Sequence, residues 1–136
     1  MSVLIDTSAL LALLGEDDPE HGRAAAVWPA LLDGEQVLTH DYVVLETSAL
    51  AQRRMGMAAV EHLHAVLLPA VDVRIVDRSK HDRAVARWRS AARRRLSLVD
   101  VVSFVVMEDA GVDRAFAFDD DFVDAGFPVV PATGTG

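Results

Sequence analysis

Acidic residues directly follow two apolar runs of the sequence. Asp6 comes after the run 3–5, and Asp119 comes after the run 115–118. Asp121, two residues further on, is a weaker candidate for the same group. Unbroken apolar runs of this kind are typical of strands covered on both faces in a parallel sheet. An acid at the end of such a strand lies where parallel sheets bind their ligands.

Two further acids lie on the apolar faces of expected helices. Glu46 is three residues after Val43 and four before Leu50, so a helix places the three side chains on one side. Asp100 is aligned in the same way with Phe104. Helix starts and strand ends share one edge of a parallel sheet, so the topology directs three of these four acids to that edge.

Each acid also has a purely structural interpretation. Asp6 could cap the first helix, and Ser97 with Asp100 matches the spacing of a capping box. Glu46 could pair with a buried arginine, and residues 119–121 could form an ordinary turn. The functional interpretation therefore rests on the coincidence of several acids at one edge of the sheet.

Carboxylates gathered at one site cannot all remain ionised without help. Two like charges about 4 Å apart repel by roughly 1 kcal/mol in water and about 4 kcal/mol at an effective dielectric constant near 20. Either some of the acids are protonated or a cation neutralises them. Because the sequence has no cysteine, the ligands would be hard oxygens, which favour Mg²⁺ or Mn²⁺ over zinc.

Such a site predicts the hydrolysis of a phosphate-bearing substrate. Mg²⁺ usually binds one or two carboxylates together with substrate phosphate. A bound cation can lower the pKa of water, polarise a phosphoryl group and stabilise the leaving oxygen. We assign Asp6, Asp100 and Asp119 as metal ligands, directly or through water, with Asp121 as a weaker fourth. Glu46 is assigned to orient water or to hold a second ion.

Strand-like and helix-like segments alternate along the chain. The expected strands cover 3–5, 36–39, 73–76, 114–118 and, at an edge, 127–130. The expected helices cover 9–14, 19–33, 42–54 with Asp41 as N-cap, 57–68, 80–95 and 97–110. This alternation predicts an α/β fold with three layers, α/β/α, around a central parallel sheet. One domain is expected over 1–131, followed by a disordered tail at 132–136.

The composition excludes several classes of protein. With 136 residues, of which 51% are hydrophobic and 25% charged, the chain has the makeup of one globular domain. No apolar run approaches the roughly 20 residues of a membrane span, and the N-terminus lacks the features of a signal peptide. A cytoplasmic protein without membrane contact is expected. The lack of cysteine excludes disulfides.

The net charge of −8 argues against a broad basic surface for nucleic acid. The placement of the charges softens that objection, because one short segment concentrates positive charge. It contains Arg83, Arg87, Arg89, Arg93, Arg94 and Arg95. Such a segment is either a solvated helix face or a binding patch. A bound cation would also supply the local positive potential that the surface as a whole lacks.

The sequence resembles the PIN-domain ribonucleases, and most closely the toxins of bacterial VapBC toxin–antitoxin pairs. Four motifs in order carry the resemblance. They are Val3-Leu-Ile-Asp-Thr-Ser-Ala-Leu10, Glu46-Thr-Ser-Ala-Leu50, Leu98-Val-Asp100, and Phe116-Ala-Phe-Asp-Asp-Asp-Phe122 followed by Gly126-Phe127. Other phosphate-binding signatures, such as the P-loop and the dinucleotide fingerprint, are absent from the sequence.

The resemblance implies a PIN-like domain and a Mg²⁺- or Mn²⁺-dependent endoribonuclease that acts on RNA. Its acid cluster would be Asp6, Glu46, Asp100 and Asp119. The resemblance also implies a homodimer and a small antitoxin that docks on the toxin and obstructs its site. One departure is Ala117, where the family often has Thr or Ser. The alternative is a catalytically weak or inactive PIN-like module that binds RNA or a protein, with the acids serving as caps and ion pairs.

Overall fold

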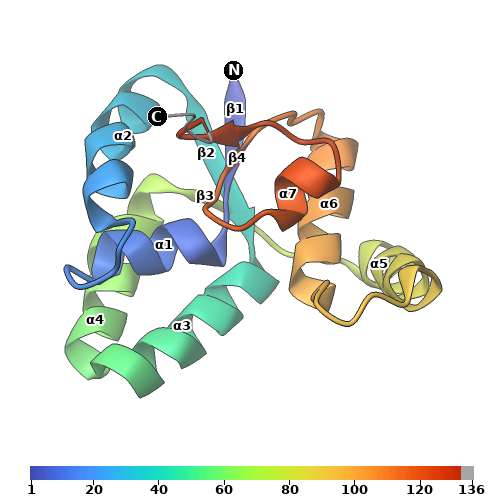
Figure 1. Ribbon diagram of the computed structural model, residues 1–136, viewed down its shortest axis with the longest axis horizontal. Helices are drawn as coiled ribbons and strands as arrows, with labels where there is room; N and C mark the ends of the chain where they lie inside the picture. The colour runs from blue at the N-terminus through green and yellow to red at the C-terminus, as the bar shows by residue number, and fades with distance from the viewer. Residues whose placement is uncertain (133–136) are drawn as a thin grey trace.

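The computed structural model describes residues 1–132 as helices packed around one five-stranded sheet (Figure 1). The strand order is β3-β2-β1-β4-β5, and every neighbouring pair is parallel. The strands are β1 (Ser2–Ile5), β2 (Gln36–His40), β3 (Asp72–Arg74), β4 (Ala115–Phe116) and β5 (Val129–Val130). The strand that comes first in the sequence therefore lies in the middle of the sheet.

The helices of the described chain cover both faces of this sheet. They are α1 (Thr7–Leu14), α2 (His21–Gly34), α3 (Asp41–Met55), α4 (Met57–His62), the π-helix η1 (Leu63–Leu67), the 3₁₀-helix η2 (Leu68–Ala70), α5 (Arg78–Ala91), α6 (Leu98–Ala110) and α7 (Asp121–Asp124). In Figure 1, α1, α2 and α4 lie on one side of the sheet and α5, α6 and α7 on the other. None of the helices in residues 1–132 has the length and apolar character needed to cross a membrane.

Successive residues of β1 point into two different cores. Leu4 packs in the core that contains Phe104 of α6. Val3 and Ile5 pack in the other core, together with Leu10 of α1. The side chains of Val3, Leu4 and Ile5 are fully buried, because each face of the sheet is covered by helices. The predicted three-layer arrangement around a parallel sheet is confirmed.

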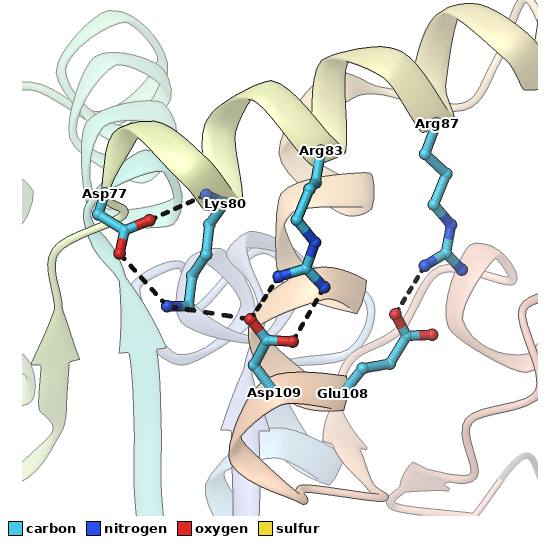
Figure 2. A network of polar contacts seen from close by, with 6 residues as sticks. All are labelled: Asp77, Lys80, Arg83, Arg87, Glu108 and Asp109. Carbon is cyan, nitrogen blue, oxygen red and sulfur yellow. Dashed lines mark hydrogen bonds and ion pairs between the residues drawn. The ribbon is translucent and has the colours of Figure 1, made fainter.

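Exposed ion pairs attach one face of α5 to the end of α6 (Figure 2). Arg83 donates to both carboxylate oxygens of Asp109, at 2.7 and 3.0 Å. Arg87 donates to Glu108 at 2.7 Å, and Lys80 Nζ lies 3.9 Å from Asp109. The first part of the arginine segment is therefore a solvated helix face, which is one of its two predicted interpretations.

The predicted helix 80–95 is wrong at its C-terminal end, because α5 stops at Ala91. Ala92 has a φ of 50°, in the left-handed region, and its N–H bonds the carbonyl oxygen of Trp88 at 3.2 Å. Alanine and arginine are good helix formers, so the sequence contains no stop signal at this point. The arginines at 93–95 consequently lie in the connection between α5 and α6.

The predicted N-cap of α3 is also wrong by one residue. His40 is the cap, and its Nδ1 accepts the N–H of Val43 at 3.4 Å. Asp41 instead accepts the N–H of Val76 at 2.9 Å, which ties the start of α3 to the segment after β3. An imidazole nitrogen can accept a capping hydrogen bond as a carboxylate does, and this leaves Asp41 free for the longer-range contact.

The remaining differences concern the lengths of elements. The predicted strands 73–76, 114–118 and 127–130 shorten to β3, β4 and β5. The predicted helix 57–68 changes its winding at Leu63, where the π-helix begins, and the end of the predicted turn 119–121 opens α7. Of the tail predicted to be disordered, residues 132–136, all but Ala132 lie outside the described residues.

Candidate active site

Asp6 ends strand β1 and caps helix α1. Its Oδ2 accepts the N–H of Ser8 at 3.1 Å and the hydroxyl of Ser8 at 2.6 Å. The Ser8 hydroxyl in turn accepts the N–H of Phe118 at 3.0 Å, so it joins Asp6 to the chain beyond β4. The structural interpretation of Asp6 as a helix cap is correct, but it uses only one of the two carboxylate oxygens.

Asp100 lies in the first turn of α6. Ser97 caps this helix, since its Oγ accepts the N–H of Asp100 at 3.0 Å. Within residues 1–132, the carboxyl group of Asp100 does not bond back to the Ser97 N–H as a complete capping box requires. It lies instead close to the carboxyl groups of Asp6 and Asp119. Capping therefore explains Ser97 and leaves the Asp100 carboxyl group unexplained.

Asp119 lies between β4 and α7. Its Oδ1 accepts the N–H of Asp121 at 3.1 Å, which is the local hydrogen bond of an Asx turn. One oxygen of its carboxyl group also lies within 4.8 Å of an oxygen of Asp6. Because β1 and β4 are neighbours in the sheet, the acids that follow these two strands meet at its carboxyl edge.

Three of the predicted site residues converge at this edge. One oxygen from each of Asp6, Asp100 and Asp119 lies within 4.8 Å of the other two. Asp6 is 1% exposed and Asp100 is 8% exposed, while Asp119 is half-buried. Three like charges are thus brought together from distant parts of the sequence, with little water to screen them.

Burial raises the pKa of every acid in this cluster. It raises the pKa of Asp6, against the lowering effect of the hydrogen bonds from Ser8. Burial raises the pKa of Asp100 to about 8, and the charges of Asp6 and Asp119 add to the shift. Burial and the charge of Asp6 raise the pKa of Asp119 to about 7. Without a cation, the protein therefore holds protons here near neutral pH.

An unused oxygen of Asp6 fits the binding of a cation. Oδ1 of Asp6 is buried and has no hydrogen-bond partner among the described residues. A buried acceptor without a partner costs about 1–3 kcal/mol, and a cation would satisfy it while neutralising the neighbouring carboxylates. The ligands are all carboxylate oxygens, which suit Mg²⁺ or Mn²⁺. The residues present therefore fit a divalent metal ion.

Glu46 and Asp121 lie outside the group of three converging acids. Asp121 still contacts this group, because its backbone N–H donates to Asp119 Oδ1 at 3.1 Å. Glu46 is half-buried on α3, next to Thr47, whose hydroxyl donates to that of Thr7 at 3.3 Å. The predicted alternative for Glu46, a pair with a buried arginine, does not occur within residues 1–132. Its catalytic role stays a prediction.

A buried histidine behind Asp100 was not foreseen from the sequence. His40 Nε2 lies 2.7 Å from Ser103 Oγ, whose hydroxyl donates to the carbonyl of Val99 at 3.1 Å. Because that hydroxyl proton is in use, Nε2 carries the hydrogen and Nδ1 accepts the N–H of Val43. Burial lowers the pKa of His40 to about 4, so the ring is neutral. This pair holds α6, just after Asp100, against the end of β2.

Residues 3–128 match the family model of the PIN domain. The chain belongs to the PIN-domain family. A relative from Mycobacterium tuberculosis, named "23S rRNA-specific endonuclease VapC20", is 36% identical over 131 residues, which cover 92% of this chain and 95% of the relative. The crystal structure of VapC20, described as a sarcin-ricin loop cleaving toxin, matches with a TM-score of 0.83 at 35% identity, over 92% of this chain and 95% of that one. The predicted resemblance to PIN-domain VapC proteins is confirmed.

More distant solved structures share the PIN fold. VapBC2 from Rickettsia felis, bound to a DNA fragment from its promoter, has a TM-score of 0.69 at 6% identity and covers 92% of each chain. A toxin–antitoxin complex from Klebsiella pneumoniae has a TM-score of 0.66 at 20% identity, over 94% of this chain and 95% of that one. At these identities the likeness establishes the PIN fold alone.

Proposed function

We propose that this PIN-domain protein is a Mg²⁺-dependent endoribonuclease, with Mn²⁺ as an alternative ion, and acts as the toxin of a VapBC-type pair. The observation that carries the proposal is the convergence of Asp6, Asp100 and Asp119, two of them buried, at the carboxyl edge of the sheet. The 36% identical relative VapC20 bears the name of an rRNA-specific endonuclease, which supports RNA as the substrate class. An RNA-cutting toxin would act in the cytoplasm.

Asp6, Asp100 and Asp119 would hold the ion, directly or through water, with Asp121 as an additional ligand. When bound, the ion supplies a lower pKa for the attacking water and stabilises charge on the leaving oxygen of the phosphodiester. The chain prepares this site by fixing one oxygen of Asp6 on Ser8, which leaves Oδ1 free.

The chain also controls the protonation of the site. Asp100 and Asp119, with pKa values raised to about 8 and about 7, carry protons near neutral pH in the absence of a cation. Carboxylate ligands must be deprotonated, so protons compete with the ion and activity rises with pH through this range. Glu46 of α3, whose neighbour Thr47 donates to Thr7 next to Asp6, would orient the attacking water.

A small antitoxin is the protein partner in this proposal. A cationic side chain neutralises the like charges of the acid cluster, so a partner that presents one could dock there and obstruct the site. A homodimer is the proposed form of the toxin. Leu45 and Ile75 are 71% and 75% exposed, and burial of such side chains by a second copy would favour a dimer.

The test is cleavage of a structured RNA by the purified protein in Mg²⁺ or Mn²⁺, with and without EDTA. Asp6→Asn and Asp100→Asn each remove one charge from the acid cluster, and Asp113→Asn removes one from an exposed position outside it. Cleavage is expected in the wild type and in Asp113→Asn. It is expected to be lost in EDTA and in both Asp6→Asn and Asp100→Asn. Cleavage that persists in EDTA or in Asp6→Asn would refute the proposal, and RNA binding without any cleavage would favour the non-catalytic module.

A further inference from the structure

The second part of the arginine segment differs from the first. Arg83 and Arg87 are engaged by acids of α6, as Figure 2 shows. Within residues 1–132, Arg89 and Arg94 form no ion pair. They belong to the residues around a depression of about 430 Å³ at the turn between α5 and α6. These residues, named here the Trp88 pocket, are Trp88, Arg89, Ala92, Arg93, Arg94 and Leu96.

The indole ring of Trp88 is held in a fixed position at this pocket. Its Nε1 donates to the carbonyl of Leu96 at 2.9 Å, across the turn that the left-handed residue Ala92 creates. The side chain is nevertheless 37% exposed. A tryptophan that is oriented by its N–H and still open to solvent offers a rigid apolar surface surrounded by guanidinium groups.

The Trp88 pocket is connected to the acid cluster by short links. Leu96, which bonds the indole, directly precedes Ser97, the N-cap of the helix that carries Asp100. Arg93 Nη2 lies 4.0 Å from Asp124 of α7. The first residue of α7 is Asp121, whose N–H donates to Asp119 of the acid cluster at 3.1 Å. Leu96 of the Trp88 pocket and Asp100 of the acid cluster are thus four residues apart, around the start of α6.

We propose that the Trp88 pocket binds an unpaired nucleotide of the RNA substrate, next to the nucleotide whose bond is cut. The base stacks on Trp88, and Arg89, Arg93 and Arg94 contact the flanking phosphates. This inference rests on the proposed ribonuclease function. Aromatic surfaces between cationic side chains bind single strands because every base has a stacking face and every phosphate a charge. In a protein with a net charge of −8, this pocket supplies the local attraction that draws RNA toward a cluster of acids.

An acidic segment of a protein is the competing occupant. The fluorescence of the indole distinguishes it from RNA. Arginines alone attract either polymer, whereas only a nucleobase stacks on the ring and quenches its fluorescence. The experiment therefore uses Trp88 as its own probe. The other tryptophan, Trp28, packs beside Phe116 at a ring distance of 6.2 Å, and Trp28→Phe removes its signal while keeping an aromatic ring there.

The binding experiment uses the Trp28→Phe, Asp100→Asn protein in EDTA, so that no RNA is cut. It is titrated with a single-stranded oligoribonucleotide, a blunt RNA duplex of equal length, and a poly-glutamate peptide. The single strand is expected to quench the fluorescence of Trp88, and the duplex and the peptide are not. Trp88→Ala should weaken binding of the single strand about tenfold, followed by electrophoretic mobility, whereas Trp88→Phe should retain most of the affinity.

The arginines are tested with a matched control. Arg94→Ala should weaken binding about tenfold and reduce the salt dependence by about one counterion. Arg53→Ala removes the same charge from the exposed far end of α3, which lies away from α5 in Figure 1, and should leave binding unchanged. Equal effects of the two substitutions would mean that RNA feels only the overall charge and would overturn the proposal.

Two outcomes separate this inference from the proposed function. If the wild type cuts no RNA in Mn²⁺ but the single strand still quenches Trp88, the ribonuclease proposal fails and the nucleotide pocket stands. If the wild type cuts RNA and Trp88→Ala, folded by circular dichroism, does so with unchanged KM and kcat, the enzyme stands and the Trp88 pocket is wrong. Quenching by poly-glutamate at the same site would assign the pocket to an acidic protein instead.

Discussion

The two edges of the sheet treat buried charge in opposite ways. At the amino edge, Arg114 before β4 forms an ion pair with Glu35 before β2, and the two side chains are 25% and 14% exposed. At the carboxyl edge, Asp6, Asp100 and Asp119 bring like charges together with equally little access to solvent. Both edges gather charged groups from distant segments, but only the first balances them.

This difference separates a structural role from a functional one. An opposite pair such as that at the amino edge is stable without any further ligand, because each charge neutralises the other. The carboxyl edge is destabilised unless protons or a cation are added, and folding alone gives no reason to maintain such an arrangement. Groups with strongly raised pKa values in contact with one another are therefore evidence for chemistry at this edge.

The largest expected effect is on activity, from a substitution that removes one like charge. Asp100→Asn should reduce kcat/KM for RNA cleavage on the order of 10²–10³-fold, because a ligand of the ion that would stabilise the negative transition state is lost. In EDTA at pH 8.5 the same variant should melt several degrees higher than the wild type, because the substitution relieves the repulsion between the ionised carboxylates. A lower melting temperature would contradict the description of the carboxyl edge as a site of repulsion.

The second effect is stabilisation by metal. Mn²⁺ at about 100 times its Kd should raise the free energy of unfolding by about 2.7 kcal/mol, provided that only the folded protein binds it. Calorimetric melting of the wild type and of Asp100→Asn measures this, and the variant should gain much less. A control with Asp113→Asn should gain as much as the wild type. Equal gains in all three proteins would exclude Asp100 as a ligand.

The third effect is a dependence of stability on pH in EDTA. A pKa that is raised on folding means that the folded protein holds the proton more tightly, so this contribution favours folding at low pH. It is lost as the pH rises from the ordinary value of 3.8 through the raised value of about 8 for Asp100. The free energies of unfolding of Asp100→Asn and the wild type should therefore be similar near pH 4 and differ by about 1–4 kcal/mol near pH 8.5. Melting curves of both proteins at the two pH values measure this difference. A difference in stability that does not change with pH would show that charge is not its cause.

The fourth effect tests the amino edge. Arg114→Met should lower the free energy of unfolding by about 1–3 kcal/mol, because Glu35 is left buried without its partner. Restoring balance with the double substitution Arg114→Met, Glu35→Gln should recover part of that loss, as denaturant melts would measure. Cleavage activity per folded molecule should be unchanged, since this pair lies at the edge opposite the acid cluster. A loss of activity in folded protein would break the separation of the two edges.

The smallest effect is expected on the exposed surface. Arg83→Ala removes an ion pair whose side chains are 52% and 31% exposed, and such pairs contribute less than about 1 kcal/mol. The free energy of unfolding of this variant, measured by chemical denaturation, should therefore lie within about 1 kcal/mol of the wild type and above that of Arg114→Met. A loss as large as that of Arg114→Met would mean that the α5–α6 ion pairs of Figure 2 determine the attachment of α5.

Local patterns were sufficient to place the acids at the strand ends. An acid that directly follows an apolar run marks where a covered strand stops, and parallel topology then dictates which ends meet, as it does for Asp6 and Asp119. The end of α5 was not predictable in this way. Ala92 favours helix by its own preference, and its left-handed conformation accompanies the bond between Trp88 and Leu96 across the turn.

Contacts between distant elements account for the other features that the sequence did not reveal. His40 is a good surface residue by type, and its burial depends on packing against Ser103 from another helix. Ser8 appears in the sequence as one of several possible caps, whereas its hydroxyl also joins Asp6 to the chain after β4. Such roles depend on which segments meet in space, and spacing within one segment carries no information about them.

Strand β1 lies at the centre of the sheet, yet its neighbour β4 is synthesised long after it. The last of the converging acids, Asp119, follows β4. A nascent chain therefore has no assembled centre until at least this residue has left the ribosome. A product of premature termination before Asp119 would accordingly lack one of the three acids of the cluster.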